Sequence, residues 1–93
     1  MIAMIKEKAR GIELLKAHAV KSGYTLNRFG HYQKDKYRFK LQKNSVRYEV
    51  KTEYGWRMIM GALYSDLSVN PENGKLSGFQ RGFVGDKIKK GDN

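Results

Sequence analysis

The sequence predicts a small single α+β domain built as a helix, a three-stranded antiparallel sheet and a second helix, with a Gly- and Lys-rich C-terminal tail. Apolar residues recur at helical spacing over residues 3–22 and again over 53–69, and the segments between them alternate apolar with charged residues. A chain of 93 residues has the length of one domain. We therefore expect one domain over residues 1–85 and a flexible basic tail over 86–93.

The first helix is expected over residues 3–22, because the apolar side chains of this segment form one face. Gly11 lowers the stability of the helix by up to ~1 kcal/mol relative to alanine. Gly23 is a suitable end, since glycine readily takes the left-handed conformation that follows a last helical turn. The residues of the apolar face are Ile5, Ala9, Ile12, Leu15, Ala19 and Val20.

Residues 36–42 and 45–52 predict a β-hairpin with one apolar and one charged face. Apolar and polar residues alternate in both segments, as they do in strands with one buried face. The register that places Leu41 opposite Val46 is strongly specified, because a slip by one residue would bury the charges. This register forms the apolar pairs Leu41–Val46, Phe39–Tyr48 and Tyr37–Val50 and the polar pairs Lys40–Arg47, Arg38–Glu49 and Lys36–Lys51.

A further strand is expected over residues 24–33, joined to the hairpin by a tight turn at residues 34–35. This turn would place Tyr32 opposite Tyr37, unless a β-bulge at Gly30 reverses part of the assignment. In this register the apolar face gains Tyr24, Leu26 and Tyr32, and the charged face gains Phe29 and His31, with His31 opposite Arg38.

The second helix is expected over residues 53–69, with Thr52 as its N-cap and the Asn-Pro pair at 70–71 after its end. Residues 58–60 could instead extend the preceding strand, but the apolar stripe continues to Leu67 and favours a helix. Two helices would then cover one face of the sheet and leave the other open to water. The stripe consists of Trp56, Ile59, Met60, Leu63 and Leu67.

Charge is the strongest functional indication, because 19 Lys and Arg against 9 Asp and Glu give a net charge of +10. The excess is greatest in residues 24–54, on the open face of the predicted sheet. A grid of cations on strands about 4.8 Å apart could contact a phosphate backbone and release its condensed counterions. The alternative is a solvated face, but the like-charged pairs across the strands argue against it, since such pairs repel. The candidate nucleic-acid-binding residues are Lys36, Arg38, Lys40, Arg47, Lys51, Phe29 and His31.

Two features allow two interpretations each. Phe29 and His31 could stack on unpaired bases, or, as we favour, Phe29 lies in the core and His31 is an ordinary surface residue. The C-terminal segment could be a nucleic-acid-binding arm that orders on contact, or Phe79 and Phe83 could fix it onto the core. The candidate contacts of such an arm are Arg81, Lys87, Lys89 and Lys90.

Catalytic, metal-binding and membrane-spanning functions are disfavoured. The chain has no cysteine, and its two histidines, His18 and His31, form with the scattered carboxylates neither the spacing of a metal site nor a nucleophile–histidine–acid triad. The glycines of GFQRGFVG fit no phosphate- or dinucleotide-binding pattern, and no apolar run approaches the ~18 residues of a membrane span. We expect a protein that is not an enzyme, has no cofactor and works in the cytoplasm, which suits a chain without disulfides.

The order helix–three strands–helix is similar to that of double-stranded RNA-binding domains, which use a basic patch at the start of their second helix. The corresponding stretch here, WRMIMGALYSDL, offers only Arg57, so this contact is not carried over. Three strands followed by a helix also look like the arm-type DNA-binding domains of phage integrases, which lay a sheet into the major groove.

The sequence therefore predicts a small, basic, non-enzymatic protein that binds DNA or RNA through the exposed charged face of its sheet. The alternative is an inhibitor or adaptor of the phage or mobile-element type, for example an anti-CRISPR protein. Such a protein would dock on an acidic protein or nucleoprotein surface, and the small size and basic charge of the chain fit it as well.

Overall fold

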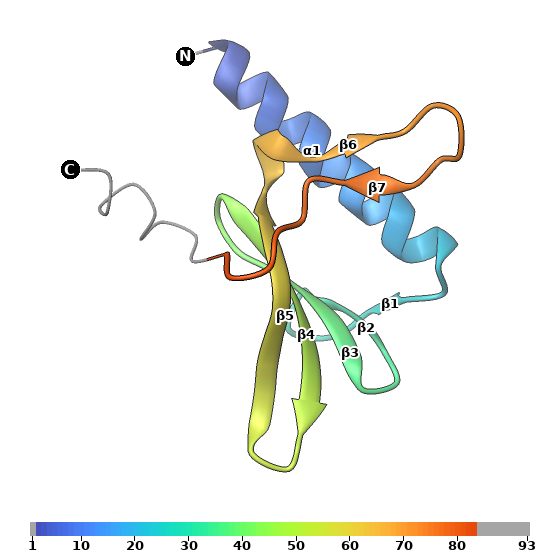
Figure 1. The fold of residues 1–93 in the computed structure, drawn as a ribbon, viewed down its shortest axis with the longest axis vertical. Helices are drawn as coiled ribbons and strands as arrows, with labels where there is room; N and C mark the ends of the chain where they lie inside the picture. Colours follow the sequence, from blue (N-terminus) through green and yellow to red (C-terminus); the bar gives the residue numbers. More distant parts are fainter. Residues whose placement is uncertain (1, 84–93) are drawn as a thin grey trace, which may run out of the picture.

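The computed structural model describes residues 2–83, with side chains from residue 6 onward. The elements in this range are α1 (Ile2–Lys21), β1 (Thr25–Leu26), β2 (Tyr32–Lys34), β3 (Tyr37–Leu41), β4 (Ser45–Thr52), β5 (Gly55–Leu63), the 3₁₀ turn η1 (Tyr64–Asp66), β6 (Ser68–Val69) and β7 (Leu76–Ser77). Strands β1 to β5 form one antiparallel sheet in chain order, and β6 and β7 form a second, two-stranded sheet (Figure 1). The predicted architecture of two helices and three strands is therefore wrong.

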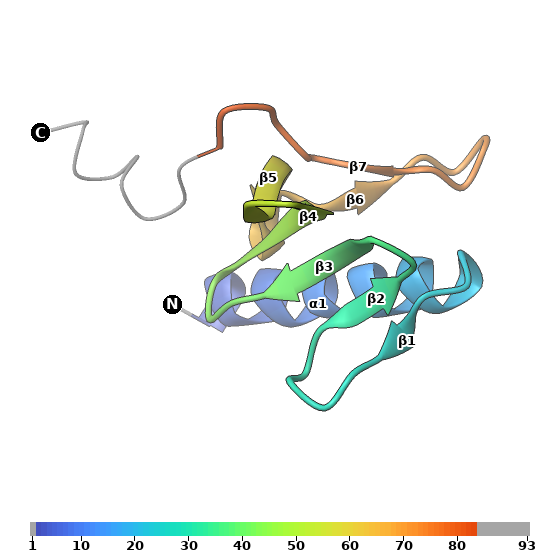
Figure 2. The ribbon, with the colours of Figure 1, turned by 90° about the horizontal axis from the view of Figure 1, so that it is seen from below.

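The helix and both sheets pack around a core on one face of the larger sheet. Figure 2 shows α1 behind β2 and β3, with β6 and β7 to one side of them, and the turn between β4 and β5 extends away from α1 (Figure 1). No helix in the described part of the chain is long and apolar enough to cross a membrane. The buried hydrophobic residues of the core are Leu15, Ala19, Tyr32, Phe39, Val46, Ala62, Tyr64 and Leu67.

The C-terminus of α1 has the geometry that a following glycine predicts. Gly23 takes a φ of +90°. Its amide donates to the carbonyl oxygen of Val20 at 3.0 Å, and the amide of Tyr24 donates to that of Ala19 at 2.9 Å. These are the two hydrogen bonds of a Schellman motif, which satisfies the last carbonyl groups of a helix.

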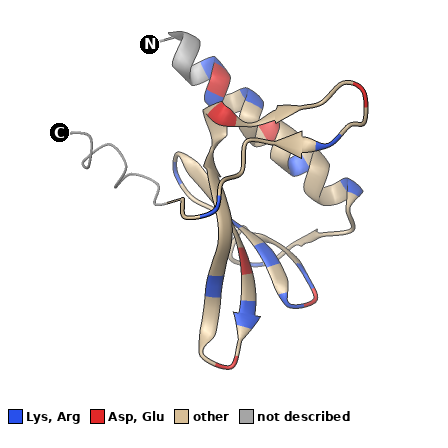
Figure 3. Cartoon of the chain, in the orientation of Figure 1, with Lys and Arg blue, Asp and Glu red and all other residues tan. Residues whose placement is uncertain are grey.

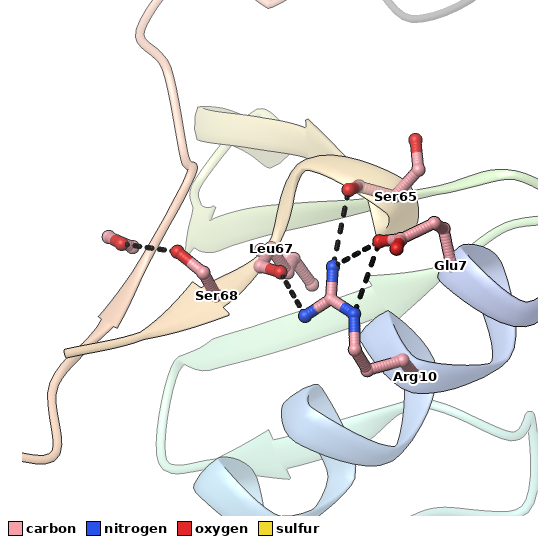
Figure 4. A network of polar contacts seen from close by, with 6 residues as sticks. Glu7, Arg10, Ser65, Leu67 and Ser68 are labelled. Atoms are coloured by element: carbon pink, nitrogen blue, oxygen red, sulfur yellow. Dashed lines mark hydrogen bonds and ion pairs between the residues drawn. The ribbon is translucent and has the colours of Figure 1, made fainter. Parts of the chain in front are cut away.

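Gly11 has a packing role in the middle of α1. It is buried, and a Cβ atom at this position would overlap the carbonyl oxygen of Tyr64 in η1. Gly11 lowers the helix propensity of α1, but it also allows α1 to pack closely against the backbone of η1. Arg10 adds a polar contact at the same place, since its Nη1 donates to the carbonyl oxygen of Leu67 at 2.8 Å while its Nη2 pairs with Glu7 at 2.7 Å (Figure 4).

The predicted register of the hairpin is confirmed. β3 and β4 pair antiparallel, with Leu41 opposite Val46 and Phe39 opposite Tyr48. The ring centroids of Phe39 and Tyr48 lie 4.8 Å apart, and Phe39 is buried. Alternation of apolar and charged residues was therefore sufficient to specify the pairing of these two strands.

The register expected for the strand before the hairpin is wrong by two residues. Tyr32 lies opposite Phe39 rather than Tyr37, because the turn is formed by residues 35–36. A shift by two residues keeps each side chain on its face, so Tyr32 is still buried. Leu26 pairs with Tyr32 but lies at the edge of the sheet and is exposed, contrary to expectation.

A loop between β1 and β2 interrupts the strand expected over residues 24–33. The Oδ1 of Asn27 organises this loop by accepting the amide of Phe29 at 2.9 Å and that of His31 at 3.0 Å. Gly30 takes a φ of +83°, which allows the chain to turn here. The side chain of Phe29 is 67% exposed, so its favoured placement in the core is wrong.

The helix expected over residues 53–69 does not form. This segment contains β5, which pairs antiparallel with β4, followed by η1 and β6. The Thr52 hydroxyl, expected to cap a helix, accepts the amide of Tyr54 at 3.1 Å and donates to the carbonyl oxygen of Gly55 at 2.7 Å. Gly55 has a φ of +107°, and together these features form the turn of a second hairpin.

The segment after β7 returns to β5 and is fixed there. Gln80 and Gly61 exchange two backbone hydrogen bonds of 3.1 and 2.8 Å. Phe83 is buried so close to Gly61 that a Cβ there would overlap its ring, and Phe79 packs against the core. Up to residue 83 the structure therefore favours fixation onto the core over a free arm. The predicted tail over 86–93 lies outside the described residues.

Candidate nucleic-acid interface

The basic side chains of β3 and β4 are directed to the face of the sheet that is turned away from α1, because neighbouring residues in a strand point to opposite faces. Lys40 lies directly opposite Arg47. Lys36 is the last residue of the turn before β3, and its carbonyl oxygen accepts the amide of Lys51 at 2.7 Å. Lys36 and Lys51 are exposed and the other two are partly exposed. Figure 3 shows basic residues on both strands. We call these four residues the cationic face.

Arg38, the fifth basic residue predicted on these strands, lies on the same side of the sheet as Lys40 but is largely covered, with its side chain 15% exposed. Its Nε donates to Oε1 of Glu49 at 2.9 Å, and its Nη2 lies 2.8 Å from the same oxygen. Glu49 is only 4% exposed, and the guanidinium carbon of Arg38 lies 4.0 Å from the centroid of the Trp56 ring. The charge of Arg38 therefore neutralises a buried carboxylate, and this residue supports the cationic face from beneath.

Arg47 contacts the same carboxylate less closely. Its Nε lies 3.5 Å from Oε2 of Glu49, which allows an ion pair but is too long for a good hydrogen bond. This nitrogen is buried and has no hydrogen-bond partner within the described residues. The side chain as a whole is 37% exposed, so its guanidinium keeps donors for an outside acceptor such as a phosphate oxygen.

The surface of β3 and β4 on this side carries one sign of charge. Glu49 is the single acidic residue of the two strands, and it is buried beneath two arginines. The exposed acids next to these strands are Asp35, which shares the turn before β3 with Lys36, and Glu53, in the turn after β4. A merely solvated face would show exposed charges of both signs between its cations, and these two strands show none that is negative.

Trp56 belongs to this face and was missed by the sequence analysis, which assigned it to a core helix. It lies in β5 opposite Lys51, whose ammonium is 5.6 Å from the centroid of the indole ring. The signal that could have identified it is Gly55, because a glycine between two strand-like segments is typical of a hairpin turn.

Phe29 and His31, the two candidate stacking residues, differ in availability. Phe29 is exposed, with the guanidinium carbon of Arg28 5.0 Å from its ring centroid. The Nδ1 of His31 accepts the amide of Leu41 at 3.1 Å. Burial lowers the pKa of His31, and the nearby positive charges of β3 lower it further. His31 is therefore neutral and structural, whereas Phe29 remains free to stack on a base.

The remaining candidates lie elsewhere. Arg81 is exposed, and Lys87, Lys89 and Lys90 lie outside the described residues. His18 packs the edge of its ring against Phe39, with centroids 6.1 Å apart, on the apolar side of the sheet. Among the residues whose side chains are described, no three His, Cys, Asp or Glu come close enough to hold a metal ion.

Comparisons with protein-family models, curated proteins and solved structures find no match to this chain. Its function therefore has to be inferred from the geometry and charge of its own surface.

Proposed function

We propose that the protein binds nucleic acid, DNA or RNA, through the cationic face and without catalysis. The observation that carries this proposal is the burial of Glu49, which leaves the four basic side chains of the cationic face, three on β3 and β4 and Lys36 just before β3, with no exposed carboxylate on these strands. Such an arrangement attracts a phosphate backbone, because each neutralised phosphate releases condensed counterions. We place this function in the cytoplasm, where a chain without cysteine has no disulfide to lose.

The basic residues would contribute in different ways. The three lysines act as flexible point charges, whereas Arg47 can present two donors to one phosphate. Arg38 and Glu49 would hold the strands and Trp56 in place beneath them. These contacts position a strand without reading its sequence. The exposed ring of Phe29 favours a partner with unpaired bases.

Salt dependence tests the proposal most directly. Fluorescence anisotropy with labelled single- and double-stranded oligonucleotides would give the affinity at several salt concentrations. Four phosphate contacts predict a slope of log K against log salt of about −3.6 on duplex DNA, which weakens binding roughly 150-fold between ~50 and ~200 mM salt. Binding that does not respond to salt would contradict a phosphate contact.

A pair of matched double variants locates the surface. Lys40→Gln with Arg47→Gln removes two contacts, so the slope should flatten by about 1.8 and binding should weaken similarly for all sequences. Lys6→Gln with Lys16→Gln removes the same charge from exposed positions on α1 and should change both much less.

Two results would overturn the proposal. Equal weakening by both double variants would show an effect of net charge alone, without a specific face. The absence of any binding at low salt would exclude nucleic acid as the partner, and an acidic protein surface would become the better hypothesis.

A further inference from the structure

A cavity of about 370 Å³ opens on the side of the large sheet that faces α1, away from the cationic face. It lies between the C-terminal end of α1, the apolar side of β3, β4 and β5, and β7. Its volume is at the lower end of the range of small-molecule pockets, which are mostly apolar with a few polar groups. The lining residues that matter here are Tyr24, Phe39, Tyr48 and Phe79, with Ser22 and Lys34 as polar neighbours.

The aromatic rings make the walls of this cavity suitable for another flat ring. The centroid of Phe39 lies 4.9 Å from that of Tyr24, 4.8 Å from that of Tyr48 and 6.1 Å from that of Phe79. The planes are tilted by 53°, 38° and 46°. Phe39 is only 4% exposed and forms the floor of the cavity, whereas Tyr24, Tyr48 and Phe79 are partly exposed around it. An aromatic guest can meet these exposed rings in the offset or edge-to-face geometries that aromatic pairs prefer.

A pair of tyrosine hydroxyls adds one hydrogen-bond donor. The hydroxyl oxygens of Tyr24 and Tyr48 lie 2.8 Å apart, and either can donate to the other. Only one of the two protons is used in that bond, which leaves the second for an acceptor on a guest. Burial raises the pKa of Tyr48, which keeps this hydroxyl protonated at neutral pH.

Lys34 decides the charge of the guest. Its ammonium donates to the carbonyl oxygen of Ser22 at 3.0 Å, which leaves two of its three donors free. It also lies 6.0 Å from the ring centroid of Tyr24, the place that a cationic guest would take. None of the lining residues that the structure describes is acidic, so the cavity favours an anionic group over a cationic one.

We propose that this cavity binds a planar aromatic ring joined to an anionic group, which is the chemistry of a nucleotide. The ring lies against the partly exposed rings of Tyr48 and Phe79, above the buried ring of Phe39. An acceptor atom of the guest meets the tyrosine pair, and the phosphate meets Lys34. A free mononucleotide and an unstacked nucleotide of a single strand share this chemistry. The site does not depend on the proposed function, because the cationic face lies on the other side of the sheet.

Titration of the ¹⁵N-labelled protein with adenosine 5′-monophosphate tests the proposal. Saturable shifts are expected for the amides of Ser22, Phe39 and Leu76 at concentrations up to about 10 mM. Adenosine should bind the same amides about five- to tenfold more weakly, because it lacks the group that meets Lys34. A single-stranded tetranucleotide that shifts these amides at lower concentration identifies a strand as the source, whereas equal affinities identify the free nucleotide.

Variants separate the two contacts. Lys34→Gln should abolish the difference between the monophosphate and adenosine, while Lys43→Gln, at an exposed lysine between β3 and β4, should preserve it. Tyr24→Phe with Tyr48→Phe keeps both rings and should weaken both ligands about tenfold.

The proposal is overturned if neither the monophosphate nor the tetranucleotide shifts the cavity amides, or if Lys34→Gln leaves the difference unchanged. Lys40→Gln with Arg47→Gln changes residues outside the cavity lining, so this double variant should still bind the monophosphate as the wild type does, even where binding through the cationic face is lost.

Discussion

The buried carboxylate of Glu49 should matter far more for stability than an exposed carboxylate does. In Glu49→Ala, the guanidinium of Arg38 loses its partner although its side chain is only 15% exposed. Leaving one member of a buried ion pair without its partner costs about 3–5 kcal/mol. A chain of this length has a total stability of roughly 5–14 kcal/mol, so the variant should lose about a fifth or more of it.

Urea denaturation followed by tryptophan fluorescence measures this loss. Trp56 is the only tryptophan of the chain and lies against Arg38, so its emission reports on the affected site. With a denaturant slope of about 1–1.5 kcal/mol per molar, the midpoint should fall by about 2–5 M. Glu72→Ala, at an exposed position between β6 and β7, should change stability by less than about 0.5 kcal/mol.

A double variant distinguishes the loss of an ion pair from the loss of packing. Arg38→Met with Glu49→Leu replaces both charges by apolar side chains of similar size, so it should be less destabilised than Glu49→Ala alone. An unchanged urea midpoint in Glu49→Ala would refute the reasoning. So would a double variant whose loss of unfolding free energy equals the sum of the losses in Arg38→Met and Glu49→Leu measured separately.

Three further predictions follow from the core and from β3. Phe39→Ala should cost about 3–5 kcal/mol in urea denaturation, because Phe39 is buried at the centre of the core; a wild-type midpoint would contradict its placement. Gly11→Ala should destabilise by about 1–3 kcal/mol despite the higher helix propensity of alanine, since the new Cβ overlaps the carbonyl oxygen of Tyr64, whereas Glu13→Ala should be nearly neutral. His31 has a lowered pKa in the folded state, so the unfolded state binds the proton more readily and the unfolding free energy should fall as the pH drops below about 6.5. His31→Asn should weaken that dependence in denaturation series at several pH values, and an identical dependence in wild type and variant would exclude His31 as its origin.

Alternation in the sequence specified β3 and β4 because these strands have a clear period of two and one buried face. The register of Phe39 opposite Tyr48 follows from that pattern alone. The position of the preceding turn was not specified in the same way, since residues 34–35 and 35–36 both preserve the face of Tyr32. Asp35 takes a φ of +54°, which suits its short polar side chain, but this preference was too weak to choose between the two turns.

The helical spacing in residues 53–69 has a physical cause that is not a helix. The pairing of β4 with β5 shifts between Tyr48 and Glu49, which lie opposite Met60 and Met58, so Ile59 is an extra residue in β5. Such a bulge breaks the period of two and leaves apolar residues three and four positions apart. A strand with a bulge can therefore show the same apolar spacing as a helix. The pairing of β5 with β4 is what identifies this segment as a strand.

Because β5 was assigned to a helix, the basic residues of the candidate site were predicted, but the burial of Arg38 and Glu49 was not. Arg38 and Lys40 differ in the predicted register only by their partners, Glu49 and Arg47, and nothing in β3 itself indicates that one of them is covered. The difference arises from Trp56, which reaches this side of the sheet only because β5 is a strand, and which covers Arg38. Once covered, Arg38 requires a counter-charge, and Glu49 supplies it at 2.8 Å. The same ion pair removes the acidic residue from the surface, so the sign of the cationic face depends on the strand that the sequence pattern concealed.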